Sequence, residues 1–241
     1  MKYAVLGDVH ANIEALEAVL ADADHRGAER YISTGDIVGY NASPLECMDR
    51  LAALGAGTVQ GNHDHYTAGN QNLDYFNPVA ADAIRWTQHQ LDAEHRQRLA
   101  ALPMTQQAAD FTVVHSSLDA PEEWKYIFSP EEAAPSLLLQ QTPLCFLGHT
   151  HRPVAFRMQG ERIGCNPYET LKLKPGWKYL INAGSVGQPR DRDPRAAYVI
   201  YDDQKQTVSL HRVEYDIPAA QAKIRAAGLP EMDALRLAAG Y

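Results

Sequence analysis

Short apolar runs that end in a small set of polar residues recur along this chain, and they constrain its fold more than any other feature. The runs cover residues 3–6, 30–34, 58–59, 111–114 and 144–147. Between the first three, residues 12–24 and 43–54 have helical patterns, the first with Ile13, Leu16, Val19 and Leu20 on one face. Alternating strands and helices indicate a sheet covered by helices.

The pattern changes after residue 153. Strands are predicted over residues 154–158, 162–165, 178–182, 197–201 and 207–215, which indicates a second, more antiparallel sheet. Residues 77–102 predict two helices, and residues 218–227 predict a last helix that Gly228 and Pro230 end. No internal repeat or linker interrupts the sequence. We therefore expect one two-sheet α/β domain over residues 1–241.

Composition excludes several classes of protein. The chain has 22 Lys and Arg against 30 Asp and Glu, a formal charge of −8, so neither bulk nucleic-acid binding nor an anionic membrane surface is expected. No run approaches the roughly 18 apolar residues of a membrane span, and the N-terminus lacks the apolar segment of a secretory signal, which favours the cytoplasm. Cys47, Cys145 and Cys165 are too scattered for a disulfide framework or a thiolate zinc site. The sequence predicts no oligomeric state.

Polar residues follow the apolar runs in five blocks. They are Gly7-Asp8-Val9-His10, Gly35-Asp36, Gly61-Asn62-His63-Asp64, His115 and Gly148-His149-Thr150-His151. The carboxyl ends of parallel strands meet at one edge of a sheet, where α/β folds bind ligands, so the blocks are expected to converge. Residues i and i+2 of an extended segment point the same way, so each D-x-H or H-x-H pair presents two ligand atoms together. Two carboxylates, an amide and up to five imidazoles suit Mn, Fe, Zn or Co.

Taken in this order, the blocks resemble the calcineurin-like metallophosphoesterase superfamily, in particular its small prokaryotic phosphoesterase branch. That pattern reads D-x-H, G-D-x-x, G-N-H-[DE], H and G-H-x-H, and residues 182–191, NAGSVGQPRD, resemble a further signature of the branch. The resemblance implies an α/β/β/α sandwich of the metallophosphoesterase type, with a dinuclear metal site at one edge.

The resemblance also implies roles for individual residues. Two divalent or transition metal ions, of Mn, Fe, Zn or Co, would be held by two ligand sets that share Asp36: Asp8, His10, Asp36 and His151 for one ion, and Asp36, Asn62, His115 and His149 for the other. Asp36 would bridge the ions with one oxygen on each, and a hydroxide between the ions would attack phosphorus. His63 would protonate the leaving oxygen, while Asp64 would accept the other N–H of His63.

Several of these residues also have simpler interpretations. Gly-Asp pairs after strands commonly form turns or helix caps, so Asp8 or Asp36 alone would indicate little. Arg190 lies in a segment of alternating charge that reads equally as a neutralised surface turn or as a source of one arginine for a substrate phosphate; we prefer Arg190 for that role, and Arg152 is similar. Tyr40 and Asn41 could line the pocket, and residues 124–126 could stack a nucleobase or simply pack.

The function indicated is hydrolysis of phosphoesters, by a phosphodiesterase or a nucleotide hydrolase that acts on small substrates such as dinucleoside polyphosphates. A phosphoserine/phosphothreonine protein phosphatase is the alternative. A protein-binding scaffold of the same fold is a third hypothesis, which the presence of His63, Asp64 and every expected ligand disfavours.

Overall fold

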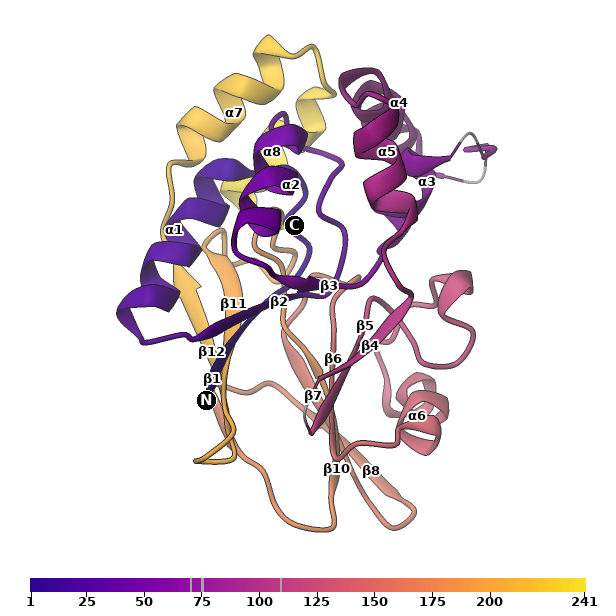
Figure 1. The fold of residues 1–241 in the computed structure, drawn as a ribbon, viewed down its shortest axis with the longest axis vertical. Helices are drawn as coiled ribbons and strands as arrows, with labels where there is room; N and C mark the ends of the chain where they lie inside the picture. Colours follow the sequence, from indigo (N-terminus) through magenta and orange to yellow (C-terminus); the bar gives the residue numbers. More distant parts are fainter. Residues whose placement is uncertain (70, 75, 109) are drawn as a thin grey trace.

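Two β-sheets packed face to face lie between layers of helices (Figure 1). The computed structural model describes residues 1–69, 71–74, 76–108 and 110–241. Within these residues each sheet has six strands. The predicted fold class, a two-sheet α/β/β/α sandwich, is confirmed.

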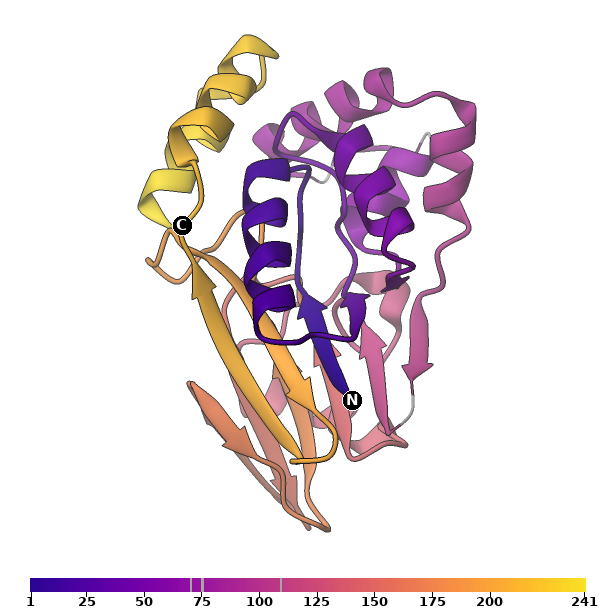
Figure 2. The same ribbon diagram turned by 60° about the vertical axis from the view of Figure 1, so that its left-hand side comes forward.

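The first sheet has the order β3 (Gly57–Thr58), β2 (Arg30–Ser33), β1 (Lys2–Leu6), β11 (Ala196–Asp202), β12 (Thr207–Val213) and β9 (Thr170–Lys172). β1, β2 and β3 are parallel, and β11 is antiparallel to β1. Helices α1 (Ile13–His25) and α2 (Pro44–Ala53) cover its outer face, as Figure 2 shows for α1. Asn12 caps α1 by accepting the N–H of Ala15 at 3.1 Å.

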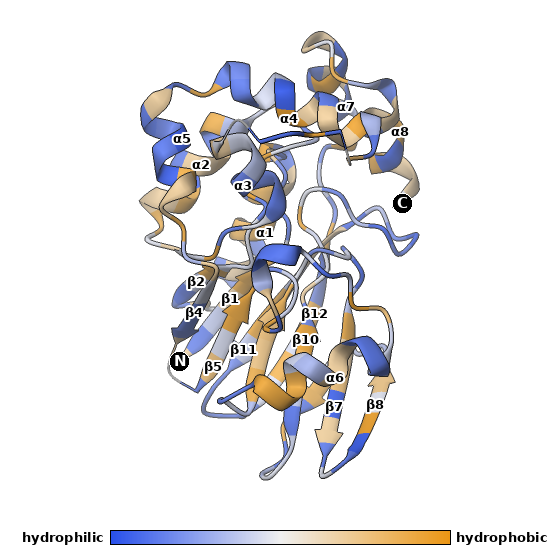
Figure 3. Cartoon of the chain, turned by 90° about the vertical axis from the view of Figure 1, so that its right-hand side faces the viewer, coloured by the Kyte–Doolittle hydropathy of each residue, from blue (hydrophilic) through white to orange (hydrophobic). Residues whose placement is uncertain are grey.

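The second sheet has the order β4 (Thr105–Ala108), β5 (Phe111–Val114), β6 (Leu144–Leu147), β10 (Lys178–Asn182), β7 (Val154–Gln159) and β8 (Arg162–Asn166). Here β5, β6 and β10 are parallel, whereas β4, β7 and β8 pair antiparallel with their neighbours. Helix α6 (Pro130–Leu139) covers the outer face (Figure 3). Each sheet therefore takes strands from both halves of the chain, a partition that local sequence patterns did not predict.

Alternation along the strands separates two hydrophobic cores. In β1, Ala4 and Leu6 pack under the helices, while Tyr3 and Val5 face the second sheet. Aromatic rings fill the space between the sheets, where Tyr3 meets Phe111 edge to face at 5.0 Å. This packing fixes the two sheets against each other and brings their strand ends into register.

The remaining helices gather beyond the carboxyl ends of the parallel strands (Figure 1). They are the short 3₁₀ turn η1 (Pro121–Glu123) and the α-helices α3 (Asn62–Ala68), α4 (Pro78–Gln90), α5 (Ala93–Ala100), α7 (Ile217–Ala226) and α8 (Glu231–Ala239). The sequence predicted α4, α5 and α7, but it did not predict α3, α6 or α8. In the described part of the chain, every helix is too short or too polar to cross a membrane.

Candidate metal centre

The five polar blocks meet at one edge of the sandwich, where parallel strands of both sheets end. Asp8 follows β1, Asp36 follows β2 and Asn62 follows β3, whereas His115 and His149 follow β5 and β6 of the second sheet. Each of these side chains is buried. The structure therefore shows that the polar blocks converge at one edge of the sandwich, as the sequence predicted.

The backbone of these residues is strained. Five of the seven predicted ligands have left-handed backbone angles, which non-glycine residues rarely adopt: the φ values are 44° for Asp8, 47° for His10, 52° for Asp36, 66° for His149 and 58° for His151. Hydrogen bonds impose this conformation, such as that from His10 N to Asp36 O at 2.8 Å. Such strain persists where surrounding structure enforces it, and it clusters at functional sites.

Two glycines let the carboxylates approach the backbone closely. A Cβ atom on Gly61 would overlap the carboxylate of Asp36, and one on Gly148 would overlap that of Asp8. In place of those clashes, His63 N donates to Asp36 Oδ1 at 2.8 Å and His149 N donates to Asp8 Oδ1 at 2.9 Å. Glycine is thus required at positions 61 and 148.

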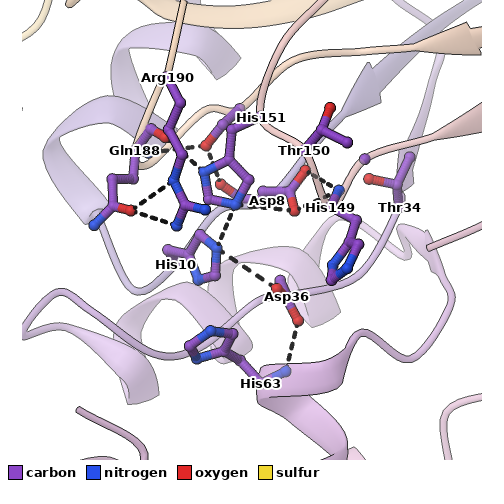
Figure 4. A network of polar contacts seen from close by, with 12 residues as sticks. Asp8, His10, Thr34, Asp36, His63, His149, Thr150, His151, Gln188 and Arg190 are labelled. Carbon is purple, nitrogen blue, oxygen red and sulfur yellow. Dashed lines mark hydrogen bonds and ion pairs between the residues drawn. The ribbon is translucent and has the colours of Figure 1, made fainter. Parts of the chain in front are cut away.

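The side chains form two adjoining clusters, the first of which, with Asp8, His10, Asp36 and His151, is drawn in Figure 4. In the first, His10 Nε2 lies 3.0 Å from His151 Nε2, which lies 3.4 Å from Asp8 Oδ1. In the second, His115 Nε2 lies 3.1 Å from both His149 Nδ1 and Asn62 Oδ1. The structure thus brings the side chains of each expected ligand set close together.

Asp36 joins the clusters through a single atom. Its Oδ2 lies 3.5 Å from His10 Nε2 and 3.5 Å from His115 Nε2. Its Oδ1 is instead engaged by the N–H of His63. From the sequence we expected one oxygen for each cation, whereas in the structure the same oxygen faces both clusters because the other accepts the N–H of His63 at the start of α3.

Each histidine of the clusters is fixed by a backbone carbonyl. The second ring nitrogen lies next to Val38 O for His10 (3.0 Å), Thr34 O for His115 (2.8 Å), Gln188 O for His151 (2.6 Å) and Trp124 O for His149 (2.9 Å). A carbonyl can only accept, so that nitrogen carries the proton and the nitrogen in the cluster keeps its lone pair. All four imidazoles are thereby prepared as ligands.

The residues present fit metal ions. Two imidazole nitrogens with facing lone pairs, at 3.0 Å in one cluster and 3.1 Å in the other, repel each other unless a cation lies nearby. The donors are nitrogen and oxygen with no thiol among the described residues near them, a set that suits Mn, Fe, Zn or Co better than Ca.

Electrostatics support the same conclusion. Burial, and then the charge of Asp36, raise the pKa of Asp8 well above its usual range, and burial raises the pKa of Asp36 to about 8. Burial also lowers the pKa of His115 to about 4 and lowers the pKa values of His10, His149 and His151 well below their usual range, so these rings are neutral at pH 7. Neutral imidazoles can bind a cation, and a cation would reverse the shift of the carboxylates.

The predicted hydrogen bond between His63 and Asp64 is wrong for this structure. Asp64 Oδ1 accepts the N–H groups of Ile37 at 2.9 Å and Val38 at 3.3 Å, and its Oδ2 accepts that of Gly61 at 3.1 Å. The carboxylate thus braces the loop that carries Asp36. Among the described residues, the buried Nδ1 of His63 has no hydrogen-bond partner.

A cavity of about 250 Å³ opens over the clusters. Its polar lining residues, the metal side, are Asp36, Asn62, His63, His149, His151 and Arg190. Its aromatic lining residues, the aromatic side, are Tyr40, Tyr66, Phe76, Trp124 and Tyr126, and the two sets adjoin where Tyr40 packs on His63 and Tyr126 on His149. The cavity can therefore present a phosphate to the clusters and an apolar, planar group to the aromatic side.

Arg190 reaches this cavity and does not form a neutralised surface turn. Its Nη2 donates to Gln188 Oε1 at 2.7 Å (Figure 4), and its guanidinium carbon lies 5.4 Å from the centre of the Tyr40 ring. The neighbouring Arg195 pairs with Asp193 instead. Arg152 is exposed and donates to Arg190 O at 2.9 Å.

Several contributors to the site were not found in the sequence. The carbonyls of Thr34, Val38, Trp124 and Gln188 act through the backbone, so their residue types carry no signal. Tyr66 and Phe76 line the cavity from α3 and the segment before α4, and single aromatics in such places are common. Asn41, proposed to line the pocket, instead donates to His10 O at 2.7 Å.

Comparisons with known proteins identify the family. Residues 1–206 match the family model described as the calcineurin-like phosphoesterase superfamily domain. Protein MJ0912 of Methanocaldococcus jannaschii is 38% identical over 241 residues, which are 98% of this chain and 97% of that protein. The crystal structure of a metallophosphoesterase from Sphaerobacter thermophilus is 45% identical with a TM-score of 0.87, covering 100% of this chain and 99% of that one.

A further similarity concerns the fold alone. The crystal structure of hypothetical protein PH1004 from Pyrococcus horikoshii OT3 is 19% identical with a TM-score of 0.82, covering 100% of this chain and 98% of that one. The predicted enzyme class, a metal-dependent phosphoesterase, is confirmed by the family match. With its two His/Asp clusters and its two-sheet sandwich, the chain belongs to the calcineurin-like phosphoesterase superfamily.

Proposed function

We propose that this chain hydrolyses small phosphodiesters or nucleotides, including dinucleoside polyphosphates, at a pair of metal ions. The observation that carries the proposal is the pair of close nitrogen–nitrogen approaches in clusters that share Asp36 Oδ2. Such an arrangement suits two cations that act on one phosphoryl group. Mn and Fe are the ions we favour for this mixed nitrogen and oxygen donor set.

The ligand roles follow the clusters. Asp8, His10, Asp36 and His151 would hold one ion, and Asp36, Asn62, His115 and His149 the other. When bound, the ions supply Lewis acidity and lower the pKa of a water that attacks phosphorus. The four backbone carbonyls keep the ligand nitrogens unprotonated, and the glycines at 61 and 148 keep the carboxylates in place.

His63 is proposed as the acid that protonates the leaving oxygen. Its Nδ1 faces Gly39, so the other ring nitrogen, Nε2, is the one free to face the cavity that His63 lines. Burial, and then Arg190 and His115, lower the pKa of His63 to about 3 in the protein without substrate. A bound phosphate brings negative charge that raises this pKa and favours the imidazolium. Asp64 contributes by bracing the Asp36 loop.

The cavity supports a small substrate with an aromatic group. Arg190 is placed to contact a phosphate oxygen, and its planar guanidinium is suited to bind two oxygens at once. Tyr126 is half exposed and stacks on the His149 ring at 4.1 Å, so its position suits a nucleobase attached to the reacting phosphate. A phosphoserine or phosphothreonine side chain carries no aromatic group that could stack on Tyr126, so this ring favours a nucleotide substrate over a phosphoprotein.

We also propose that residues 1–241 form one domain. The family model ends at residue 206, but the last helices pack on the rest of the fold: Arg192 N donates to Gly240 O at 2.7 Å, and Ile224 and Leu237 are buried against Tyr40.

A substrate panel tests the function. The Mn-reconstituted chain should hydrolyse bis(p-nitrophenyl) phosphate and diadenosine tetraphosphate. For diphenyl phosphate, whose phenolate leaving group is basic, His63→Ala should lower kcat by about 10²–10⁴-fold while keeping its metal by elemental analysis. Turnover of a phosphopeptide alone would favour the protein phosphatase. Absence of turnover on the whole panel, with metal bound, would leave the scaffold as the better hypothesis.

A further inference from the structure

The imidazole of His63 lacks the carboxylate partner that would orient it. Both oxygens of Asp64 are engaged by backbone N–H groups of Gly61, Ile37 and Val38. His63 is buried, with 3% of its surface exposed, and its Nδ1 has no hydrogen-bond partner in the part of the chain that is described. Some other contact must therefore hold this ring at the edge of the cavity.

Gly39 faces the unpartnered nitrogen. A Cβ atom on Gly39 would overlap His63 Nδ1 and would lie 2.9 Å from His63 Cγ. The φ angle of Gly39 is 93°, in the region that L side chains rarely adopt. The absence of a side chain at this position thus leaves the space that the His63 ring occupies, and any larger residue would push the ring toward the cavity.

Tyr40 packs against the same ring. The ring centres of Tyr40 and His63 lie 4.4 Å apart, and Tyr40 also meets His10 at 4.7 Å. Tyr40 is itself held in place, because it is buried and the Arg190 guanidinium lies over its ring. On another side, His10 meets the His63 ring edge to face at 4.8 Å. The ring is thus confined by neighbours on several sides.

We propose that Gly39 and Tyr40 are positioning residues that orient the His63 imidazole through shape, in place of a carboxylate partner. The inference rests on the proposed function, in which the Nε2–H bond of His63 breaks as an O–H bond forms. The electron pair of the breaking P–O bond goes to that leaving oxygen. Proton donation requires a distance of about 2.6–3.2 Å, so a displaced ring cannot perform it.

The leaving group provides the diagnostic readout. A p-nitrophenolate leaves without much help from a proton, whereas phenolate is more basic and benefits more from an acid. Displacement of His63 should therefore slow the hydrolysis of diphenyl phosphate more than that of bis(p-nitrophenyl) phosphate. A general loss of folding or metal would slow both equally.

The first test compares Gly39→Ala with Gly55→Ala in the Mn-loaded full chain. Gly55 also has a positive φ, 61°, but nothing lies within 4 Å of its added Cβ, so it controls for backbone strain. We expect Gly39→Ala to lower kcat on diphenyl phosphate at least about 10-fold more than on bis(p-nitrophenyl) phosphate, with KM within about twofold and metal content unchanged. Gly55→Ala should show no such difference.

The second test separates ring packing from the tyrosine hydroxyl. Tyr40→Leu should show the same dependence on the leaving group as Gly39→Ala. Tyr40→Phe keeps the ring, so its kcat should stay within about threefold of wild type. Equal losses on the two substrates, or loss of metal from Gly39→Ala, would overturn the positioning role. The positioning role would also be overturned if wild type were active and lost activity on His63→Ala, but kept full activity with Gly39→Ala and with Tyr40→Leu. An inactive wild type would instead contradict the proposed function.

Discussion

The two sides of the cavity differ in how their side chains are held. On the metal side, each cluster histidine has its second nitrogen on a backbone carbonyl, and Asp8 Oδ1 accepts the N–H of His149 at 2.9 Å. On the aromatic side, ring packing dominates: Tyr66 and Phe76 meet edge to face at 4.6 Å, and Tyr126 remains 50% exposed. Backbone hydrogen bonds fix the direction of the cluster side chains, whereas the half-exposed Tyr126 has room to adjust to a substrate. The chemistry is therefore the more rigid part of this site, and substrate choice at Tyr126 is the adaptable part.

The largest expected effect tests the rigid side. Asp36→Asn removes the charge of the oxygen that faces both clusters, while asparagine tolerates the left-handed backbone at φ 52°. We expect a loss of at least about 10³-fold in kcat and lower occupancy of both metals, measured by steady-state kinetics and elemental analysis. Asp82→Asn, at an exposed position on α4, is the matched control. Two metals at full occupancy in the Asp36 variant would contradict the bridging role.

Removal of the metals should make the stability of the protein depend on the protonation of the buried Asp36 carboxyl group. The pKa of Asp36 is raised from 3.8 to about 8 by burial, so the unfolded state loses this proton first as pH rises. Stability of the metal-free protein should therefore fall between about pH 4 and pH 8, and the loaded protein should not show this decline. At neutral pH, chelation should lower Tm by roughly 10 °C. Differential scanning calorimetry with and without chelator, over a range of pH, measures the pH dependence and the change in Tm. If the stability of the two forms changed equally with pH, the buried Asp36 carboxyl group would not be the cause.

The smallest effect is expected on the aromatic side. Tyr126→Ala removes a ring that stacks on His149 but leaves every cluster hydrogen bond intact. We expect KM for diadenosine tetraphosphate to rise by about 5–10-fold, as for the loss of one stacked base, with little change for bis(p-nitrophenyl) phosphate. Kinetics on both substrates measure this selectivity. A collapse of kcat on both would show that the two sides are not independent.

The same contrast explains what the sequence could reveal. The cluster residues were predictable because their blocks follow strands, and the ends of parallel strands converge whatever the details of packing. The hydrogen-bond partner of His63 was not predictable. Asp64 follows His63 directly in the sequence, but its carboxylate turns back to accept the N–H groups of Ile37 and Val38. Tertiary contacts decided that choice.

Proline explains much of what was missed in the fold. Helix α8 begins directly after Pro230, where proline serves as the cap of a new helix and not only as the end of α7. Helix α6 contains Pro135, and its capping box at Ser129 and Glu132 together with its packing on the second sheet compensates for that interruption. Only the complete fold shows the surface that each segment covers, which is the second sheet for α6 and helix α7 for α8.

Each cluster draws its ligands from both sheets: His151 joins Asp8 and His10 in one, and His149 and His115 join Asn62 in the other. A bound ion would therefore cross-link the two sheets of the sandwich. Linkage works in both directions, so a change that loosens the packing of Phe111 and Phe146 between the sheets should also weaken metal affinity. The affinity of this edge for metal then reports on the integrity of the whole sandwich, including parts remote from the reacting phosphate.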